Sequence, residues 1–314
     1  FAAIAEKNEV LIINSENLYV VSSTEMEKEL CRMEMKYLLE DEAGTGYIFT
    51  TKDIDPSRSP YIKMKISILY KAADVNEIIN KIKEDNIAYD KFKVNYLKNE
   101  VDDIPYNDRL DLVKEIGFVI TGFPDIHQPA INLGIIKVDG IWIFGEIYKN
   151  NLSWQKYDKK PYSYSNALTV KVARALVNIA VGCEMNKKIV DPCCGIGTVV
   201  MEALDQGIEI KGYELSKQIA SNARDNIQHF GYDRDIIKQG NMHDIKDEYD
   251  VSIVDIPYGL FSPVTKEEQQ EIINTARRIS RKMIIVTFED MHKEIIKAGF
   301  KITDGCIVKK GSMN

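Results

Sequence analysis

The sequence predicts an α/β fold in which the C-terminal half forms a mostly parallel, doubly wound sheet. From residue 188 onward, short Val/Ile-rich runs alternate with helical runs, which is typical of parallel strands joined by helices. Two of these runs end in an acid, Asp191 ahead of a glycine loop and Asp255 ahead of a proline. Since ligands bind at the carboxyl ends of strands in open α/β sheets, we expect the functional site there.

The length of 314 residues is more than one core usually covers, and it predicts two domains or more. We expect an N-terminal α+β subdomain, a second α+β domain, a polar connection and the α/β domain, over residues 1–60, 61–150, 151–163 and 164–314. A net charge of −7 gives no general attraction to nucleic acid, so phosphate contacts need local basic patches. One such patch is Arg277, Arg278, Arg281 and Lys282.

Composition predicts a cytoplasmic protein without a membrane span or a metal site. The chain has no apolar run of the roughly 18 residues that crossing a bilayer requires, and its first residues lack a basic leader. Its five cysteines form no metal-binding spacing, and an odd number suits a reducing compartment.

The first 150 residues alternate strands and helices in the manner of a ferredoxin-like α+β module. We expect strands over 10–13, 18–21, 47–50, 62–70, 91–97, 131–138 and 141–148, and helices over 24–40, 75–83 and 107–116. Thr24 and Glu27 predict a capping box at the start of the first helix. Residues 125–129 contain an acid and a histidine, and we interpret them as a loop.

After the connection the pattern becomes a regular α/β alternation. We expect strands over 188–191, 209–215, 236–238, 249–254, 283–288 and 301–309, and helices over 168–181, 198–206, 216–230 and 265–280. Gly182 ends the first of these helices, and Thr265 with Glu268 predicts a capping box at the start of the last.

The loop from Asp191 to Thr198 lies between a strand and a helix, where Gly195 and Gly197 allow backbone amides to approach an anionic group. The third glycine of a dinucleotide fingerprint would fall at Val200 and is absent. Glu214 ends the next strand, and an acid there can accept hydrogen bonds from both ribose hydroxyls. The pattern indicates a nucleoside with a small charged tail, and S-adenosylmethionine fits that description.

Asn241 and Met242 follow the third strand of this half. The Asn241 amide oxygen can accept a hydrogen bond from an adenine amino group while Met242 packs on the ring. A polar loop without such a role is the alternative.

Asp255-Ile256-Pro257-Tyr258 predicts a site for a planar amine. An ionised Asp255 accepts one N–H of an exocyclic amine, the Ile256 carbonyl, aimed by Pro257, accepts the other, and Tyr258 stacks on the base. Taken alone, the same four residues could form a β-turn.

These motifs resemble those of class I methyltransferases that share THUMP domains and modify tRNA, especially the guanosine-N2 enzymes of archaea and eukaryotes. Their D-P-F-C-G-T-G-T loop corresponds to residues 191–198 and their D-P-P-Y-G to residues 255–259. The resemblance implies a Rossmann-like sheet, S-adenosylmethionine as cofactor, and cofactor contacts from Asp191, Cys193, Gly195, Gly197, Glu214, Asn241 and Met242. It implies an amine site at Asp255, Ile256, Pro257 and Tyr258. The chain departs from the family pattern at Cys193, Ile196, Asn241 and Ile256.

Residues 61–149 resemble a THUMP domain, an RNA-binding module, through the stretches 103–106, 125–127 and 141–146. The resemblance implies that this domain presents an RNA acceptor end to a catalytic partner. A methyltransferase sheet of this class usually ends with a further antiparallel strand. Either residues beyond 314 or the expected strand over 10–13 could supply it.

The sequence therefore predicts an S-adenosylmethionine-dependent RNA methyltransferase that acts on an exocyclic base amine, guanine N2 in tRNA. An N6-adenine or other amine methyltransferase acting on rRNA or DNA is the alternative within the class. A catalytically silent RNA-binding protein and a nucleotide-binding oxidoreductase are alternatives of other classes, and the absence of glycine at position 200 disfavours the oxidoreductase.

Overall fold

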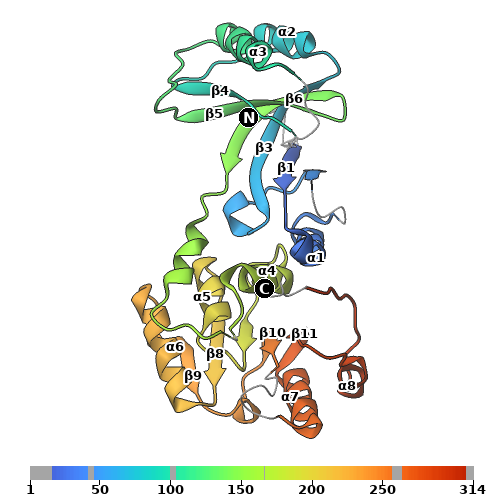
Figure 1. Ribbon diagram of the computed structural model, residues 1–314, viewed down its shortest axis with the longest axis vertical. Coiled ribbons are helices and arrows are strands. Elements are labelled where there is room, and N and C mark those ends of the chain that lie inside the picture. The colour runs from blue at the N-terminus through green and yellow to red at the C-terminus, as the bar shows by residue number, and fades with distance from the viewer. Residues whose placement is uncertain (1–15, 42–45, 100–103, 166, 257–263, 309–314) are drawn as a thin grey trace, which may run out of the picture. The chain divides into compact units, whose positions relative to one another are not determined.

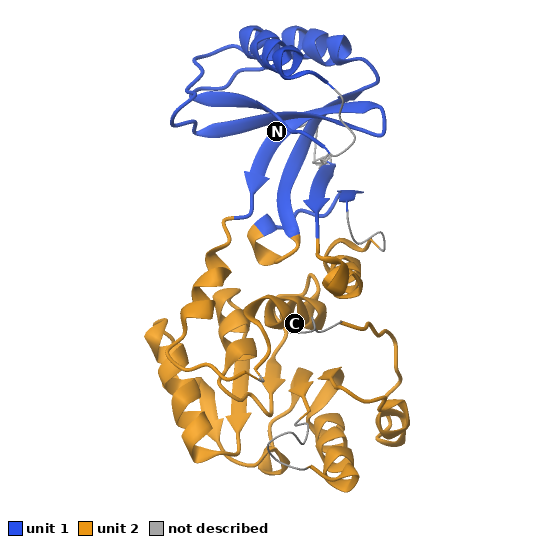
Figure 2. Cartoon of the chain, in the orientation of Figure 1, with its two compact units in different colours: residues 1–22, 45–56, 62–150 blue, residues 23–44, 57–61, 151–314 orange. Residues whose placement is uncertain are grey.

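A computed structural model describes residues 16–41, 46–99, 104–165, 167–256 and 264–308. The chain divides into two compact units, shown in different colours in Figure 2. Unit 1 comprises residues 1–22, 45–56 and 62–150, and unit 2 comprises residues 23–44, 57–61 and 151–314. No helix among the described residues is long and apolar enough to cross a membrane.

Unit 1 is a six-stranded sheet with two helices, α2 and α3, on one face (Figure 1). The strand order is β2-β1-β3-β6-β5-β4, and only β4 and β5 pair in parallel. The bounds are β1 (Asn17–Val21), β2 (Gly46–Thr50), β3 (Ile62–Ala72), α2 (Val75–Glu84), β4 (Phe92–Tyr96), α3 (Tyr106–Val119), β5 (Ile131–Val138) and β6 (Ile141–Lys149). Each strand and helix expected within 16–150 is present, with shifts of a few residues at the ends.

Unit 2 contains a five-stranded parallel sheet in the order β11-β10-β7-β8-β9. Its strands are β7 (Ile189–Asp191), β8 (Ile210–Glu214), β9 (Ile237–Gln239), β10 (Tyr249–Asp255) and β11 (Ser280–Val286). Its helices are α1 (Lys28–Leu39), α4 (Val170–Val181), α5 (Thr198–Asp205), α6 (Lys217–His229), α7 (Lys266–Ile279) and α8 (His292–Lys297). The doubly wound α/β fold expected from the sequence is confirmed, and the strand order reverses between β7 and β10.

Alternate residues of the central strands face two apolar cores. Ile189 and Ile253 belong to a cluster with residues of α4, α5 and α6, whereas Val190 and Val254 belong to one with residues of α7. Helices therefore cover both faces of the sheet, as near-continuous Val/Ile runs in its strands require.

The units divide the chain differently from the boundaries expected at residues 60 and 163. Helix α1 and residues 57–61 belong to unit 2, while β1 and β2 join the sheet of unit 1. The connection contains a 3-10 helix, Ser153–Lys159, whose Trp154 and Tyr157 are buried. It is therefore part of unit 2 rather than a free linker.

Two further expectations need correction. The Thr24 hydroxyl donates to the Glu27 carboxylate (3.2 Å) and accepts no backbone N–H, so no capping box forms, and residues 25–27 are a 3-10 turn. Residues 301–308 do not form a strand; instead Ile307 N donates to Glu29 Oε2 (2.8 Å) and Asp304 pairs with Lys36 on α1. Helix α8 was not predicted. The expected strand over 10–13 lies outside the described residues.

Candidate functional site

Where the strand order reverses, two adjacent strands each end in an acid. Strands β7 and β10 pair in parallel, Asp191 is the last residue of β7 and Asp255 is the last residue of β10. Asp191 is buried and Asp255 is partly buried. This reversal is the point of an open α/β sheet at which a crevice for ligands is expected.

The glycine loop after β7 folds back on the end of β8. Cys193 N donates to Asp191 Oδ1 (3.3 Å), and Cys194 N donates to the Tyr213 carbonyl (2.8 Å). Gly195 N donates to Glu214 Oε2 (3.1 Å). The loop, the acid of β7 and the acid of β8 are thus joined by hydrogen bonds.

Gly195 and Gly197 have φ angles of 51° and 82°, in the left-handed region that favours glycine. A Cβ at Gly197 would come within 3.1 Å of Ile237 Cδ1, because the loop packs closely on β9. A Cβ at Gly195 would meet nothing within 4 Å, so open space lies above the loop at that residue. That space is available to a ligand.

Glu214 is held in place by two backbone amides. Its Oε2 accepts from Gly195 N, and its Oε1 accepts from Ser216 N (2.8 Å). Each carboxylate oxygen keeps a further lone pair, so Glu214 can also accept hydrogen bonds from two hydroxyl groups.

The loop after β9 contacts the glycine loop. Asn241 is exposed, and its Oδ1 accepts from His243 N (3.0 Å), which begins a 3-10 turn over Met242–Asp244. Met242 is only 5% exposed, and its Sδ lies 3.7 Å from Cys193 Sγ. Met242 therefore joins its own loop to the glycine loop through a buried contact with Cys193.

Burial raises the pKa of Asp191 well above its usual range, and the charges of Asp255 and Glu214 raise it further. Burial also raises the pKa of Asp255 to about 6. Within the described part of the chain, Asp255 Oδ1 is buried and has no hydrogen-bond partner. Three neighbouring acids and an unpaired buried acceptor suit a ligand that brings positive charge and N–H donors.

The amine motif is described only in part. Ile256 is buried, and its N donates to the Val286 carbonyl (3.1 Å), which continues the pairing of β10 with β11 past Asp255. Pro257 and Tyr258 lie outside the described residues.

Asn226 of α6 is a residue that sequence reasoning missed. It is fully buried, its Oδ1 accepts from Tyr162 N (2.9 Å), and its Nδ2 donates to the carbonyls of Tyr162 and Ile196 (both 3.0 Å). It ties the segment before α4 to the glycine loop. In the sequence, the feature that could have identified Asn226 is its helical spacing from Ala223, which places a polar amide on the apolar face of the predicted helix.

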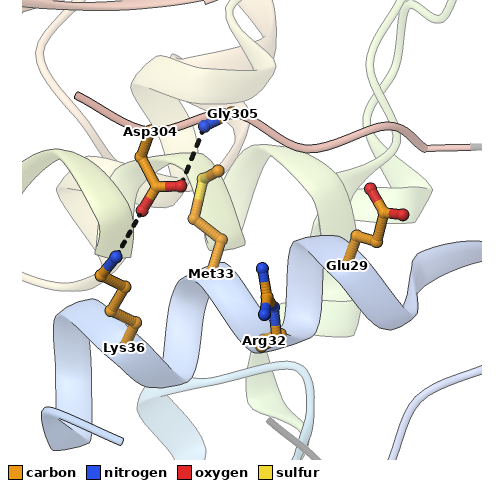
Figure 3. A pocket seen from close by; sticks show the side chains of 6 residues that line it. All are labelled: Glu29, Arg32, Met33, Lys36, Asp304 and Gly305. Carbon is orange, nitrogen blue, oxygen red and sulfur yellow. Dashed lines mark hydrogen bonds and ion pairs between the residues drawn. The ribbon is translucent and has the colours of Figure 1, made fainter. Parts of the chain in front are cut away.

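Two other predicted or visible features do not form sites. The four basic residues over 277–282 do not form one patch, because two of them bind backbone carbonyls in different parts of unit 2. Lys282 Nζ donates to the Ile179 carbonyl (2.7 Å), and Arg278 donates to the carbonyls of residues 243 and 245. The hollow in Figure 3 has balanced charges, with side chains from Glu29, Arg32, Met33 and Lys36 on α1 and from Asp304. Among the described residues no cluster of His, Cys, Asp or Glu could hold a metal ion.

Residues 158–294 match the UPF0020 family model, described as "RMKL-like, methyltransferase domain". The chain is 23% identical to a tRNA (guanine(10)-N2)-dimethyltransferase of Methanothermobacter thermautotrophicus, over 74% of this chain and 72% of the relative. It is 26% identical to the Pyrococcus abyssi enzyme of the same name, over 50% of this chain and 52% of the relative.

A mouse relative, U6 snRNA (guanine-N(2))-methyltransferase THUMPD2, is 26% identical over 45% of this chain and 28% of its own length. Similar solved structures include TrmN from Thermus thermophilus, with a TM-score of 0.42, 13% identity and coverage of 90% of this chain and 91% of that one. Another is a predicted N6-adenine-specific DNA methylase from Listeria monocytogenes, with a TM-score of 0.44, 16% identity and coverage of 95% of each chain.

Proposed function

We propose that this chain, whose residues 158–294 form a methyltransferase domain, transfers a methyl group from S-adenosylmethionine to guanine N2 in tRNA. The observation that carries the proposal is Asp255 at the end of β10, whose buried Oδ1 has no hydrogen-bond partner among the described residues. The curated relatives named as tRNA guanine-N2 dimethyltransferases support the choice of base and RNA.

The residues around the glycine loop fit the proposed cofactor. S-adenosylmethionine, when bound, supplies an activated methyl group on a positively charged sulfur. Glu214 has lone pairs for the two ribose hydroxyls, and Asn241 is exposed at the position proposed for adenine. The open space at Gly195 leaves room for the ligand chain, and the buried Asp191 carboxyl lies at the end of β7, where the loop begins. Gly197 allows the glycine loop to pack closely on β9, and Cys193 of that loop contacts Met242 of the next one, so these three residues support the surface proposed to bind the cofactor.

The amine site is proposed at Asp255 to Tyr258. An ionised Asp255 accepts one N–H of the base amine, and the Ile256 carbonyl accepts the second. Pro257 directs that carbonyl, and Tyr258 stacks on the base. Holding the nitrogen in line with the methyl group supplies most of the rate enhancement, since the electrophile is already activated. The nitrogen gives up one proton on methylation, and Asp255 is the acceptor beside it.

We further propose that residues 61–150 form a THUMP-like domain that binds the tRNA. The relative named THUMPD2 supports an RNA substrate for this chain. Because the whole chain is acidic, contacts to phosphates must come from local groups of Lys and Arg on unit 1, such as Lys91, Lys93 and Lys98.

The test is to incubate the pure protein with methyl-labelled S-adenosylmethionine and separate pools of tRNA, rRNA and DNA, followed by nucleoside mass analysis. N2-methylguanosine or N2,N2-dimethylguanosine in tRNA is the expected product, and Asp255→Ala is the inactive control. Label only in DNA or as N6-methyladenosine would refute the choice of substrate. If the protein does not bind the cofactor, the result would instead support the alternative of a catalytically silent RNA-binding protein.

A further inference from the structure

Helix α7 holds the loop that carries Asn241 by polar contacts on two of its turns. This loop, residues 240–245, is called the Asn241 loop below. Thr275 Oγ1 lies 2.6 Å from His243 Nδ1, and Thr275 is only 7% exposed. Arg278 lies one turn further along, on the same face of the helix. Met242 and Ile245 belong to the apolar core that α7 covers.

Arg278 makes the charged contact of this set. Its Nη1 donates to the Ile245 carbonyl (2.6 Å), and its Nη2 donates to the His243 carbonyl (3.0 Å). A guanidinium is planar and always charged, so it fixes the distance and direction of both carbonyls together. The two carbonyls lie on the 3-10 turn that follows Asn241 and just beyond it.

The effect of Arg278 reaches Asn241 through His243. Asn241 Oδ1 accepts from His243 N, while Arg278 holds the carbonyl of the same residue. The orientation of the Asn241 side chain therefore depends on a backbone segment that Arg278 fixes from outside the loop.

We propose that Arg278 is a positioning residue for recognition of the adenine amino group. The proposal rests on the proposed function, in which Asn241 reads adenine. Arg278 acts by holding the Asn241 loop in the conformation that presents Asn241 Oδ1 to that amino group. It has no contact with the base itself.

The neighbouring residue supplies a matched control. Arg277 is exposed on the same helix turn, but its Nε donates to the Gly299 carbonyl (3.4 Å) and its guanidinium lies 5.5 Å from the centre of the Phe300 ring. Arg277→Gln and Arg278→Gln remove the same charge from the same helix. Only Arg278→Gln releases the Asn241 loop.

The experiment measures the dissociation constants of S-adenosylhomocysteine and S-inosylhomocysteine by calorimetry for the whole chain and both variants. The inosine compound carries an oxygen in place of the amino group. We expect the unaltered chain to prefer the adenosine compound. Arg278→Gln should weaken adenosine-compound binding by about tenfold or more and reduce the preference toward unity, because two charge-assisted hydrogen bonds are lost. Arg277→Gln should match the unaltered chain.

Thermal unfolding of both variants separates this role from a loss of fold. If Arg278→Gln does not fold, Thr275→Val tests the same loop, and we expect it to lower the preference in the same direction. Unchanged affinity and preference in the folded Arg278 variant, or an equal change in the Arg277 variant, would overturn the positioning role. An unaltered chain that binds neither compound would instead refute the proposed function itself.

Discussion

Asp255 combines three properties that a positioned acceptor needs. It ends β10 where the strand order reverses, its Oδ1 has no partner among the described residues, and burial raises its pKa to about 6. An unpaired buried oxygen is costly, and such a cost is usual where a ligand completes the hydrogen bonding. At pH 7 most of the carboxyl is ionised and can accept an amine N–H.

The raised pKa gives a testable pH dependence. Because the acceptor must be ionised, kcat/KM should rise as pH increases from 5 to 7, with an apparent pKa of about 6. Asp255→Asn should lower kcat by about 100-fold or more and remove this titration, while binding of S-adenosylhomocysteine is kept. The measurement is a pH–rate profile for both proteins. A variant that keeps the pH dependence would show that another group titrates.

The glycine loop and α5 form the element on which the proposed cofactor contacts depend. Gly195 lies in the loop before α5 and Gly207 lies just after the helix, and both have positive φ angles, of 51° and 71°. A Cβ added at either residue would meet nothing within 4 Å. They therefore carry similar backbone strain when replaced by alanine. They differ in that Gly195 donates its N–H to Glu214 and lies in the loop, whereas Gly207 ends the helix.

Replacing each glycine with alanine separates strain from binding. Both variants should lose about 1–2 kcal/mol of unfolding free energy, which is the usual cost of a left-handed residue. Only Gly195→Ala should also weaken S-adenosylhomocysteine by about tenfold or more, because its methyl group enters the space above the loop. Denaturant unfolding and calorimetry give the two quantities. Equal affinities in the two variants would place the ligand elsewhere.

Across unit 2, a buried polar network joins segments that are far apart in the chain. Glu34 of α1 is fully buried and accepts from Ser59 Oγ (2.6 Å) and from Asn178 Nδ2 of α4. Arg174 of α4 pairs with Glu202 of α5 (2.7 Å) and donates to the carbonyls of residues 57 and 58. Helix α1 and residues 57–61 are thereby fixed to the methyltransferase domain.

This network predicts a pH effect on stability. Burial raises the pKa of Glu34 from 4.5 to about 7, so the folded state binds its proton more tightly than the unfolded state. The contribution of Glu34 to stability is therefore full below pH 4.5 and is lost as pH rises through 7. Glu34→Gln should remove this loss, so the variant gains stability relative to the unaltered chain between pH 5 and 8. Denaturant midpoints at several pH values measure it, and a constant difference would contradict it.

Short sequence patterns predicted most of the helices and strands. Two predicted capping boxes with the same spacing, of which only one forms, show where such patterns fail. Thr265 and Glu268 form the predicted box, with Thr265 N to Glu268 Oε2 at 2.8 Å and Glu268 N to Thr265 Oγ1 at 3.2 Å. Thr24 and Glu27 have the same spacing, yet the hydroxyl binds the carboxylate, and Glu27 also pairs with Lys171 of α4. A distant lysine thus engages the carboxylate that the box would need.

The amino-acid sequence was sufficient for the parallel sheet, the glycine loop and the acids at the strand ends, because each depends on residues close together in the chain. Which loops meet at the site depended on tertiary contacts. The pairing of Met242 with Cys193, the buried Asn226 and the hold of Arg278 on the Asn241 loop join residues separated by tens of positions. Side-chain periodicity reports which face of an element is buried but not which distant segment covers it, and packing in three dimensions makes that choice.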